Sequence, residues 1–269
     1  VKLTQTAGWS TDYANWHYRK KITFDNTTAS LGVTSEALVD FPVLVKLDSS
    51  RIDYSLTQNA GQDIRFTDSD GTMLPYEIER WNESGSSYVW VKVPSIDINS
   101  NTDYIYVYYG NTGASDTQSP NNVWDADFLG VWHGNDSSGT NVVDSTVNNK
   151  TGTKASSTQP APLSSGSIAG AQTYTQGSSR VGTTINNSLG DFSVEVWFKD
   201  DGIATGYERL ADKSYSNCFW LGRNNANSNS WGGGIKETSD PYGVFVTLPD
   251  NAWHQIATIR SGTTHYMYG

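Results

Sequence analysis

The chain has 269 residues, 28 acidic against 18 basic side chains, a formal net charge of −10 and 12% aromatic residues. An acidic surface repels phosphate backbones, which argues against a nucleic-acid partner. No apolar run approaches the roughly 18 residues of a membrane span, so we expect no membrane insertion. No signal peptide is visible, so we expect a mature or trimmed chain. Abundant aromatic residues are typical of β-rich domains. Cys218 is the only cysteine, which rules out an intrachain disulfide, and we expect it to pack as a small hydrophobe.

The first part of the chain predicts a series of strands at hairpin spacing. Alternating or β-rich runs occupy 16–24, 41–47, 63–67, 74–81, 88–93 and 104–109. Asp70-Gly71 is a hairpin signal, because glycine allows the positive φ that such turns need. In the last run, Ile105 and Val107 are expected to face the core, which leaves the alternating tyrosines as a partly exposed stripe. No helical pattern lies between these runs, and this predicts an antiparallel sandwich or barrel.

Several motifs in this part are similar to a known family. They are DFPVLV (40–45), DIRFTDSDG (63–71), LPYEIE (74–79), VWVKVP (89–94) and YYGN (108–111). Together they resemble domain of unknown function 2341, which implies a β-sandwich and an extracellular setting but no activity. We therefore predict a first domain over 1–113, followed by a linker rich in Thr, Ser, Gly and Pro over 114–122.

The stretch 125–152 places a predicted apolar strand, 128–132, before a loop rich in side-chain oxygens. The loop contains Asp136, Asp144, Asn148 and Asn149. Calcium takes six to eight oxygen ligands from carboxylates, amides and backbone carbonyls. The same residues are also the ordinary residues of turns, so spacing alone leaves both interpretations open.

Three segments of the second half are similar to concanavalin A-like, laminin-G type jelly rolls. They are WH (132–133) followed by DSTVNN (144–149), then LGDFSVEVWFK (189–199) and LPDNAWHQIA (248–257). The resemblance implies a second antiparallel sandwich over 123–269. It also implies a structural calcium at Asp144 and Asn149, with Asn148 and Asp136 as weaker matches. Because the family usually continues for several strands beyond the position of Gly269, we expect an incomplete sandwich with an open edge.

Aromatic and amide side chains gather in the loop-rich part of this second domain. Indole and phenol rings pack on the C–H groups of sugars, while amides bind sugar hydroxyls. This mixture predicts carbohydrate binding by Trp220, Trp231, Tyr207, Tyr215, Arg223, Asn224 and Tyr242. The alternative for each aromatic residue is a place in the core.

No catalytic residue is predicted. Glu77 and Glu79 lie two apart on one strand and share a face, which suits the paired carboxylates of a glycosidase. We expect them instead on a solvated face, paired with Arg80 or Lys92. The four histidines are scattered, and no spacing indicates a nucleophilic triad.

Together these features predict an all-β chain of two antiparallel, jelly-roll-like β-sandwich domains in a non-catalytic extracellular or cell-surface protein. The expected role is carbohydrate binding or adhesion, with a glycan or polysaccharide as partner and calcium as a structural ion. One alternative is a structural subunit of a surface layer, sheath or filament, joined by strand addition to copies of itself or to a neighbouring chain. Another is an accessory module of a polysaccharide-degrading enzyme. Glycosylation sequons occur at Asn26, Asn82, Asn135, Asn149 and Asn186.

Overall fold

The computed structural model describes residues 13–30, 35–175, 177, 179–185, 190–202, 206–213, 218–224, 229–236 and 243–269. The predicted all-β class is confirmed, with antiparallel sheets throughout these residues. No helix in this part of the chain is long and apolar enough to cross a bilayer. The chain forms two compact units, Val1–Thr184 and Ile185–Gly269.

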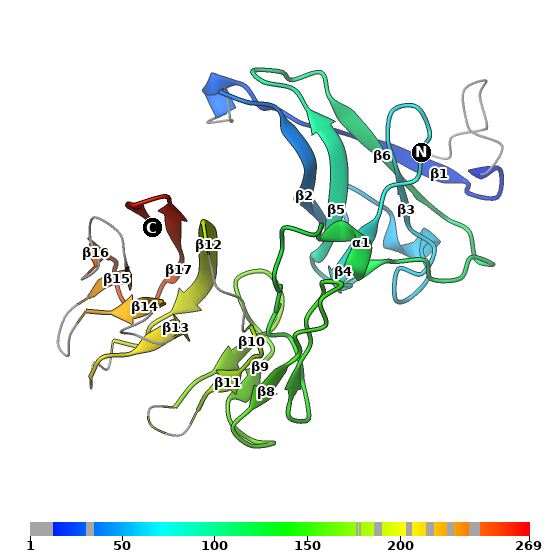
Figure 1. Cartoon of the computed structure of the whole chain (residues 1–269). Coiled ribbons are helices and arrows are strands. Elements are labelled where there is room, and N and C mark those ends of the chain that lie inside the picture. The colour runs from blue at the N-terminus through cyan, green and yellow to red at the C-terminus, as the bar shows by residue number, and fades with distance from the viewer. Residues whose placement is uncertain are drawn as a thin grey trace. The chain divides into compact units, whose positions relative to one another are not determined.

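Two three-stranded sheets form the sandwich of the first unit (Figure 1). One has the order β1-β6-β3 and the other β2-β5-β4. Along β5, buried residues alternate with half-buried ones, as expected for a strand with one face on the core. The strands are β1 (Tyr18–Thr23), β2 (Leu38–Leu47), β3 (Arg65–Thr67), β4 (Tyr76–Arg80), β5 (Ser87–Ile96) and β6 (Tyr104–Tyr109). Two 3-10 turns accompany them, η2 (Thr28–Ser30) and η3 (Tyr54–Leu56).

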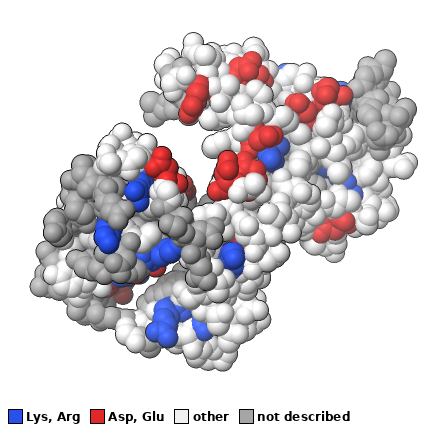
Figure 2. Space-filling model, in the orientation of Figure 1, with Lys and Arg blue, Asp and Glu red and all other residues white. Residues whose placement is uncertain are grey.

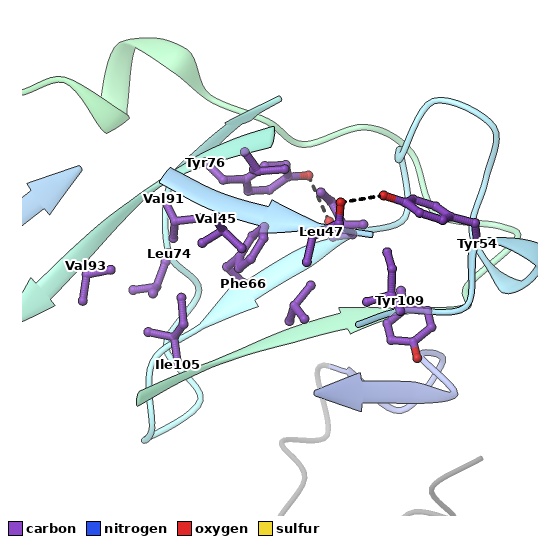
Figure 3. Packing of buried hydrophobic residues seen from close by; sticks show 14 of the residues in the cluster. Val45, Leu47, Tyr54, Phe66, Leu74, Tyr76, Val91, Val93, Ile105 and Tyr109 are labelled. Carbon is purple, nitrogen blue, oxygen red and sulfur yellow. Dashed lines mark hydrogen bonds between the residues drawn. The ribbon is translucent and has the colours of Figure 1, made fainter. Parts of the chain in front are cut away.

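The core of this sandwich contains tyrosines whose hydroxyl groups are paired inside it (Figure 3). The Tyr54 hydroxyl donates to the Leu47 carbonyl at 3.1 Å, and the Tyr76 hydroxyl to the Ile64 carbonyl at 3.0 Å. A buried hydroxyl without such a partner would destabilise the fold. Most of the core is aliphatic, and its buried members include Val45, Leu47, Ile64, Phe66, Leu74, Val89, Val91, Val93, Ile105 and Val107.

The predicted tyrosine stripe lies on the opposite face of β6 and is largely covered by cations. The Lys21 ammonium lies 3.7 Å from the ring centroid of Tyr104, and the Arg19 guanidinium lies 4.3 Å from that of Tyr106. Tyr108 is buried and stacks on Tyr13 with centroids 4.7 Å apart. The alternation along β6 is therefore confirmed, and cation–π contacts stabilise its outer face.

The turn at Asp70-Gly71 is confirmed, but the strand after it changes sheet. Gly71 has φ +94° and donates its N–H to the Asp68 carbonyl. A single bridge, Thr67 to Met73, follows the turn. The chain then leaves β3, and β4 pairs with β5 in the other sheet. The change of sheet buries Leu74 and Tyr76 in the core.

The predicted linker 114–122 packs against the first sandwich, so the structure differs from the predicted domain boundary. Arg65 donates to the Ser115 carbonyl at 2.6 Å, and the Ile78 N–H donates to the Gln118 side chain at 3.0 Å. The first unit continues to residue 184 through α1 (Pro120–Val123), a three-stranded sheet, β11-β8-β7, and a two-stranded sheet, β10-β9. These strands are β7 (Asn141–Val142), β8 (Gly152–Lys154), β9 (Ala161–Leu163), β10 (Ala171–Thr173) and β11 (Val181–Gly182).

The prediction of a strand at 128–132 is wrong, because the segment has no regular secondary structure. The Val131 N–H donates to the Asp144 carboxylate at 2.9 Å, and the Val131 carbonyl accepts from Ser145 N–H at 2.9 Å. The backbone of this apolar segment is therefore paired with a loop rather than with a strand ladder.

In the second unit, a three-stranded sheet, β12-β17-β18, faces a four-stranded sheet, β13-β14-β15-β16 (Figure 1). The core between them includes Phe198, Leu221, Trp231 and Ile256. Cys218 is half-buried beside β14. The strands are β12 (Phe192–Lys199), β13 (Arg209–Lys213), β14 (Phe219–Arg223), β15 (Ser230–Ile235), β16 (Val244–Thr247), β17 (Trp253–Ser261) and β18 (Thr264–Tyr268).

Candidate functional site

Two carboxylates lie buried on the outer face of the sheet β2-β5-β4. Tyr76 packs into the core, so the next side chain along β4, Glu77, projects from the opposite face, and Glu79 follows it two residues later. Glu77 stands opposite Trp90 in the register of β4 with β5. Glu77 is 8% exposed and Glu79 is 9% exposed, so the expectation of a solvated pair is wrong.

The cover over these carboxylates comes from residues 124–145. Trp124 donates its indole N–H to Glu77 Oε2 at 2.8 Å, and Ser145 Oγ donates to Glu77 Oε1 at 2.6 Å. Glu79 accepts from the Trp90 indole at 3.1 Å and from the Asn135 amide at 3.3 Å. The expected partners lie elsewhere. Lys92 is 3.9 Å from Asp40, and Arg80 contacts the Ser86 carbonyl.

His133 lies between the two carboxylates. Its Nε2 is 3.1 Å from Glu77 Oε2, and its Nδ1 contacts Glu79 Oε2. The imidazole stacks on Trp90 with centroids 6.4 Å apart, and Trp124 lies 5.9 Å from it. We call Glu77, Glu79, Trp90, Trp124, His133 and Ser145 the carboxylate clasp.

Electrostatics in the clasp favour a charged imidazole. Burial lowers the pKa of His133, but the hydrogen bonds and charges of both glutamates outweigh burial and raise this pKa to about 10. Burial raises the pKa of Glu77, but the hydrogen bond and charge of His133, with the Ser145 and Trp124 hydrogen bonds, bring it below its usual value. Elsewhere charged side chains are scattered over a mostly uncharged surface on the face seen in Figure 2.

This geometry supports a structural role for the clasp better than acid–base chemistry. A general base must be deprotonated at the working pH, and His133 stays protonated through the neutral range. A glycosidase places substrate between its two carboxyl groups, whereas here the imidazole occupies that position. The clasp therefore fixes residues 124–145 on the sandwich.

The four residues predicted to hold calcium all form hydrogen bonds with protein groups of their own loop or its neighbours. Asp144 is buried, and its two oxygens accept four hydrogen bonds, from the backbone of Val131, Thr146 and Lys150 and from the Thr146 hydroxyl. Asp136 accepts from Val143 N–H, Asn148 donates to the Phe128 carbonyl, and Asn149 donates to the Val147 carbonyl. Within the described residues no cluster of three or more acidic, histidine or cysteine side chains could hold a metal ion.

The predicted carbohydrate-binding residues that the structure describes do not lie together on one exposed surface. Trp231 is 2% exposed and packs on Phe198 in the core. Trp220 is 5% exposed. In the register of β14 with β15, Arg223 stands opposite Trp231, whereas Trp220 stands opposite Gly234. Because side chains alternate along a strand, Trp220 lies on the opposite face of the sheet from Arg223 and Trp231.

The other predicted carbohydrate-binding residues also include both buried and exposed side chains. Arg223 is fully buried and forms ion pairs with Asp200 and, at 3.0 Å, with Glu208. Tyr207 is 69% exposed and Asn224 is half-buried. Tyr215 and Tyr242 lie outside the described residues.

A different set of aromatic residues is exposed on the second unit. Trp197 of β12 is 44% exposed, and Tyr266 and Tyr268 of β18 are 46% and 57% exposed. All lie on the outer face of β12-β17-β18, because the alternate residues Val194, Val196, Ile256 and Met267 pack into the core. Glu195 and Gln255 are exposed on the same face and hydrogen-bonded to one another. We call Trp197, Tyr266, Tyr268, Glu195 and Gln255 the aromatic face.

The sequence contains a signal for this face. Val194, Val196 and Phe198 alternate along one strand, which places Trp197 on the opposite side. The pairing of β18 with β17, which sets Tyr266 and Tyr268 on that same side, depends on a register that strand alternation alone does not fix.

A protein-family profile described as a domain of unknown function (DUF2341) matches residues 60–150. This confirms the resemblance for that part of the chain, and the matched range includes all six residues of the carboxylate clasp. The match leaves the concanavalin A-like resemblance of the second half unconfirmed. None of the curated proteins and none of the solved structures compared with the chain matches it.

Proposed function

We propose that this chain is a non-catalytic, extracellular or cell-surface carbohydrate-binding protein, and that its second unit, a concanavalin A-like sandwich, binds sugar on the aromatic face. The observation that carries the proposal is the exposure of Trp197, Tyr266 and Tyr268 on one sheet face. Large apolar side chains exposed together usually mark an interaction site.

The polar residues of the aromatic face favour sugar over an apolar partner. Gln255 of β17 stands opposite Trp197, and Glu195 precedes Trp197 by two residues on β12, so hydrogen-bonding groups lie next to the stacking groups. Binding sites for small polar ligands combine aromatic walls with a few placed polar groups in this way. The site serves adhesion, or brings an enzyme carried elsewhere to a polysaccharide.

Calcium is not required by this proposal. The predicted ligands lie in the first unit, where Asp144 already satisfies its oxygens with protein donors. A calcium ion there would have to replace hydrogen bonds that hold the loop together.

A glycan array and titration calorimetry test the proposal with three variants of the whole chain. Trp197→Ala and Tyr268→Ala are expected to weaken sugar binding at least about tenfold each, since a stacked aromatic contributes roughly 1 kcal/mol or more beyond its buried area. Tyr207→Ala is the matched control, because Tyr207 is an exposed tyrosine of the same unit outside the aromatic face. Loss of binding in the control alone, or no sugar bound by the unaltered chain, contradicts the proposal.

Strand addition is a second candidate, supported by one observation. In the described residues, β18 pairs with β17 along one of its two edges. An edge without a strand partner accepts a strand from the same chain or from another chain. Polymers seen by electron microscopy that disappear on Met267→Pro, in a chain that binds no sugar, would favour this assembly role.

A further inference from the structure

The aromatic face is a track across three strands rather than a single pocket. Trp197 stands opposite Gln255, while Ala257 stands between Glu195 and Tyr268. Two residues further along β17, Ile259 stands between Ser193 and Tyr266. The three aromatic side chains thus occupy three successive levels of one face.

The register gives the length of this track. Successive outward residues of one strand are ~7 Å apart, and neighbouring strands are ~5 Å apart. Trp197 and Tyr266 differ by four residues along the strands and by two strands across them. Their separation in the sheet is therefore ~17 Å, which is several times the width of one pyranose ring.

The middle of the track has one small side chain, Ala257, next to two polar ones, Glu195 and Gln255. Ala257 has the smallest side chain on this part of the face, between Glu195 and the larger Tyr268. The Gln255 amide donates to Glu195, which leaves the second Glu195 oxygen and the Gln255 carbonyl as acceptors. A ligand above them must offer hydrogen-bond donors, as the hydroxyl groups of a sugar do.

Charge on this face is unevenly placed. Glu195 carries a negative charge on β12 at the middle level of the track, beside Ala257, and Lys199 lies beyond Trp197, opposite Trp253. Four residues separate the two side chains along β12, or ~13 Å, so Lys199 does not neutralise the centre. A carboxylate on the ligand would meet Glu195 and be repelled.

We infer that the aromatic face takes a linear, neutral oligosaccharide of at least three sugar rings, in preference to a monosaccharide or a uronic-acid polymer. This inference rests on the proposed function and adds the ligand class. Rings that stack on Trp197, Tyr268 and Tyr266 in turn place their hydroxyl groups over Glu195 and Gln255.

The first experiment is a length series. Titration calorimetry with 1,4-linked gluco- and manno-oligosaccharides of one to six rings is expected to show affinity rising at least about tenfold from one ring to four, because longer ligands add stacking contacts. Equal affinity for one ring and four rings overturns the inference and leaves the proposed function standing. Binding of no sugar in either series overturns both.

The second experiment tests whether the charge of Glu195 disfavours a ligand that carries carboxylates. The tightest oligosaccharide of the series is compared with the same molecule after oxidation of its primary hydroxyls to carboxylates. The unaltered chain is expected to bind the oxidised form at least about tenfold more weakly, and Glu195→Gln is expected to reduce this ratio between the two affinities. Lys199→Gln is the matched control and should leave this ratio unchanged, because Lys199 lies ~13 Å from Glu195 along β12. Selectivity unchanged by Glu195→Gln contradicts the inference.

A third measurement tests whether the aromatic face binds a second copy of the chain instead of a sugar. Sedimentation is expected to give the same oligomeric state for the unaltered chain and for Trp197→Ala. A dimer that dissociates in this variant would assign the aromatic face to self-association and overturn the inference.

Discussion

His133 is the side chain on which the carboxylate clasp depends, because it contacts both glutamates. In His133→Ala, Glu77 and Glu79 face one another in a buried place without a cation. Removing one partner of a buried ion pair costs about 3–5 kcal/mol, and we expect a loss of this size in the free energy of unfolding measured with urea. His17→Ala is the matched control, since His17 is exposed and bonds one carbonyl. A loss below about 1 kcal/mol, as at an exposed pair, would show that the clasp contributes little.

The clasp also predicts a pH dependence of stability. The pKa of His133 rises from 6.5 to about 10 on folding, so its contribution is complete below pH 6.5 and is lost as the pH rises towards 10. The pKa of Glu77 falls from 4.5, so its contribution is present above pH 4.5 and is lost as the pH falls. The clasp therefore stabilises the fold most between pH 4.5 and 6.5.

Urea unfolding at intervals from pH 5 to pH 9 measures this dependence below the ordinary pKa of tyrosine. The unaltered chain is expected to lose stability steadily above pH 6.5, and His133→Ala should lack that decline. Parallel curves for the two proteins would contradict a charged imidazole in the folded clasp.

At the residue scale, sequence reasoning found the shared face of Glu77 and Glu79 but not their burial. Alternation along a strand fixes which residues share a face, and this is confirmed. Burial depends on His133 and Ser145, which lie 56 and 68 residues further along the chain. A single sequence offers no signal for contacts at that separation, so the pair read as an ordinary solvated pair.

At the scale of elements, the loop 131–150 is organised around the Asp144 carboxylate. It accepts hydrogen bonds from residues 131, 146 and 150, and so connects the two ends of the loop. Asp144→Ala leaves these N–H groups unpaired, and we expect a loss of at least about 2 kcal/mol in the free energy of unfolding. Asp136→Ala is the matched control, because Asp136 accepts a single backbone bond in the same loop.

Measurement of both variants in calcium and in chelator decides which interaction holds the loop. The structure predicts the same loss for Asp144→Ala in the two conditions, since protein donors satisfy the carboxylate. A loss seen only in calcium, together with a higher melting temperature of the unaltered chain in calcium, would instead support the predicted metal site. The residue types of this loop suggest either role, because oxygen-rich turns and cation sites share a composition.

The strands of the second unit show what alternation can and cannot predict. The pattern of β12 predicts its core face, and Val194, Val196 and Phe198 do pack inward. Trp220 and Trp231 belong to β14 and β15, where burial on both faces removes the alternation that would have separated core from surface. The predicted sugar-binding set therefore contains both core and exposed residues and does not include Trp197.

At the scale of the whole molecule, the question is where the first unit ends. Composition predicted a boundary in the linker 114–122, since Ser, Thr, Gly and Pro mark loops. That segment is instead bonded to β4, with Ser119 N–H donating to the Tyr76 carbonyl at 2.9 Å, and the unit continues to residue 184. The family match over residues 60–150 crosses the predicted boundary as well.

This boundary predicts how fragments of the chain behave. A fragment of residues 1–184 keeps the whole carboxylate clasp and is expected to unfold in one cooperative transition in urea. A fragment of residues 1–113 lacks Trp124, His133 and Ser145, so Glu77 and Glu79 face solvent as a repelling pair beside an uncovered Trp90. It should be less stable by several kcal/mol, because the surface of the sandwich around Trp90 loses its apolar cover, and should bind a hydrophobic dye that the longer fragment does not bind.

The His133→Ala variant of the longer fragment measures the effect of losing the His133 charge while residues 124–145 are still present. If the clasp fixes residues 124–145 on the sandwich, the variant should fall between the two fragments in stability and expose 124–145 to protease. Equal stability of the two unaltered fragments would mean that the sandwich of the first six strands folds without its cover. The domain boundary would then lie where composition first placed it, and the clasp would join two independent parts.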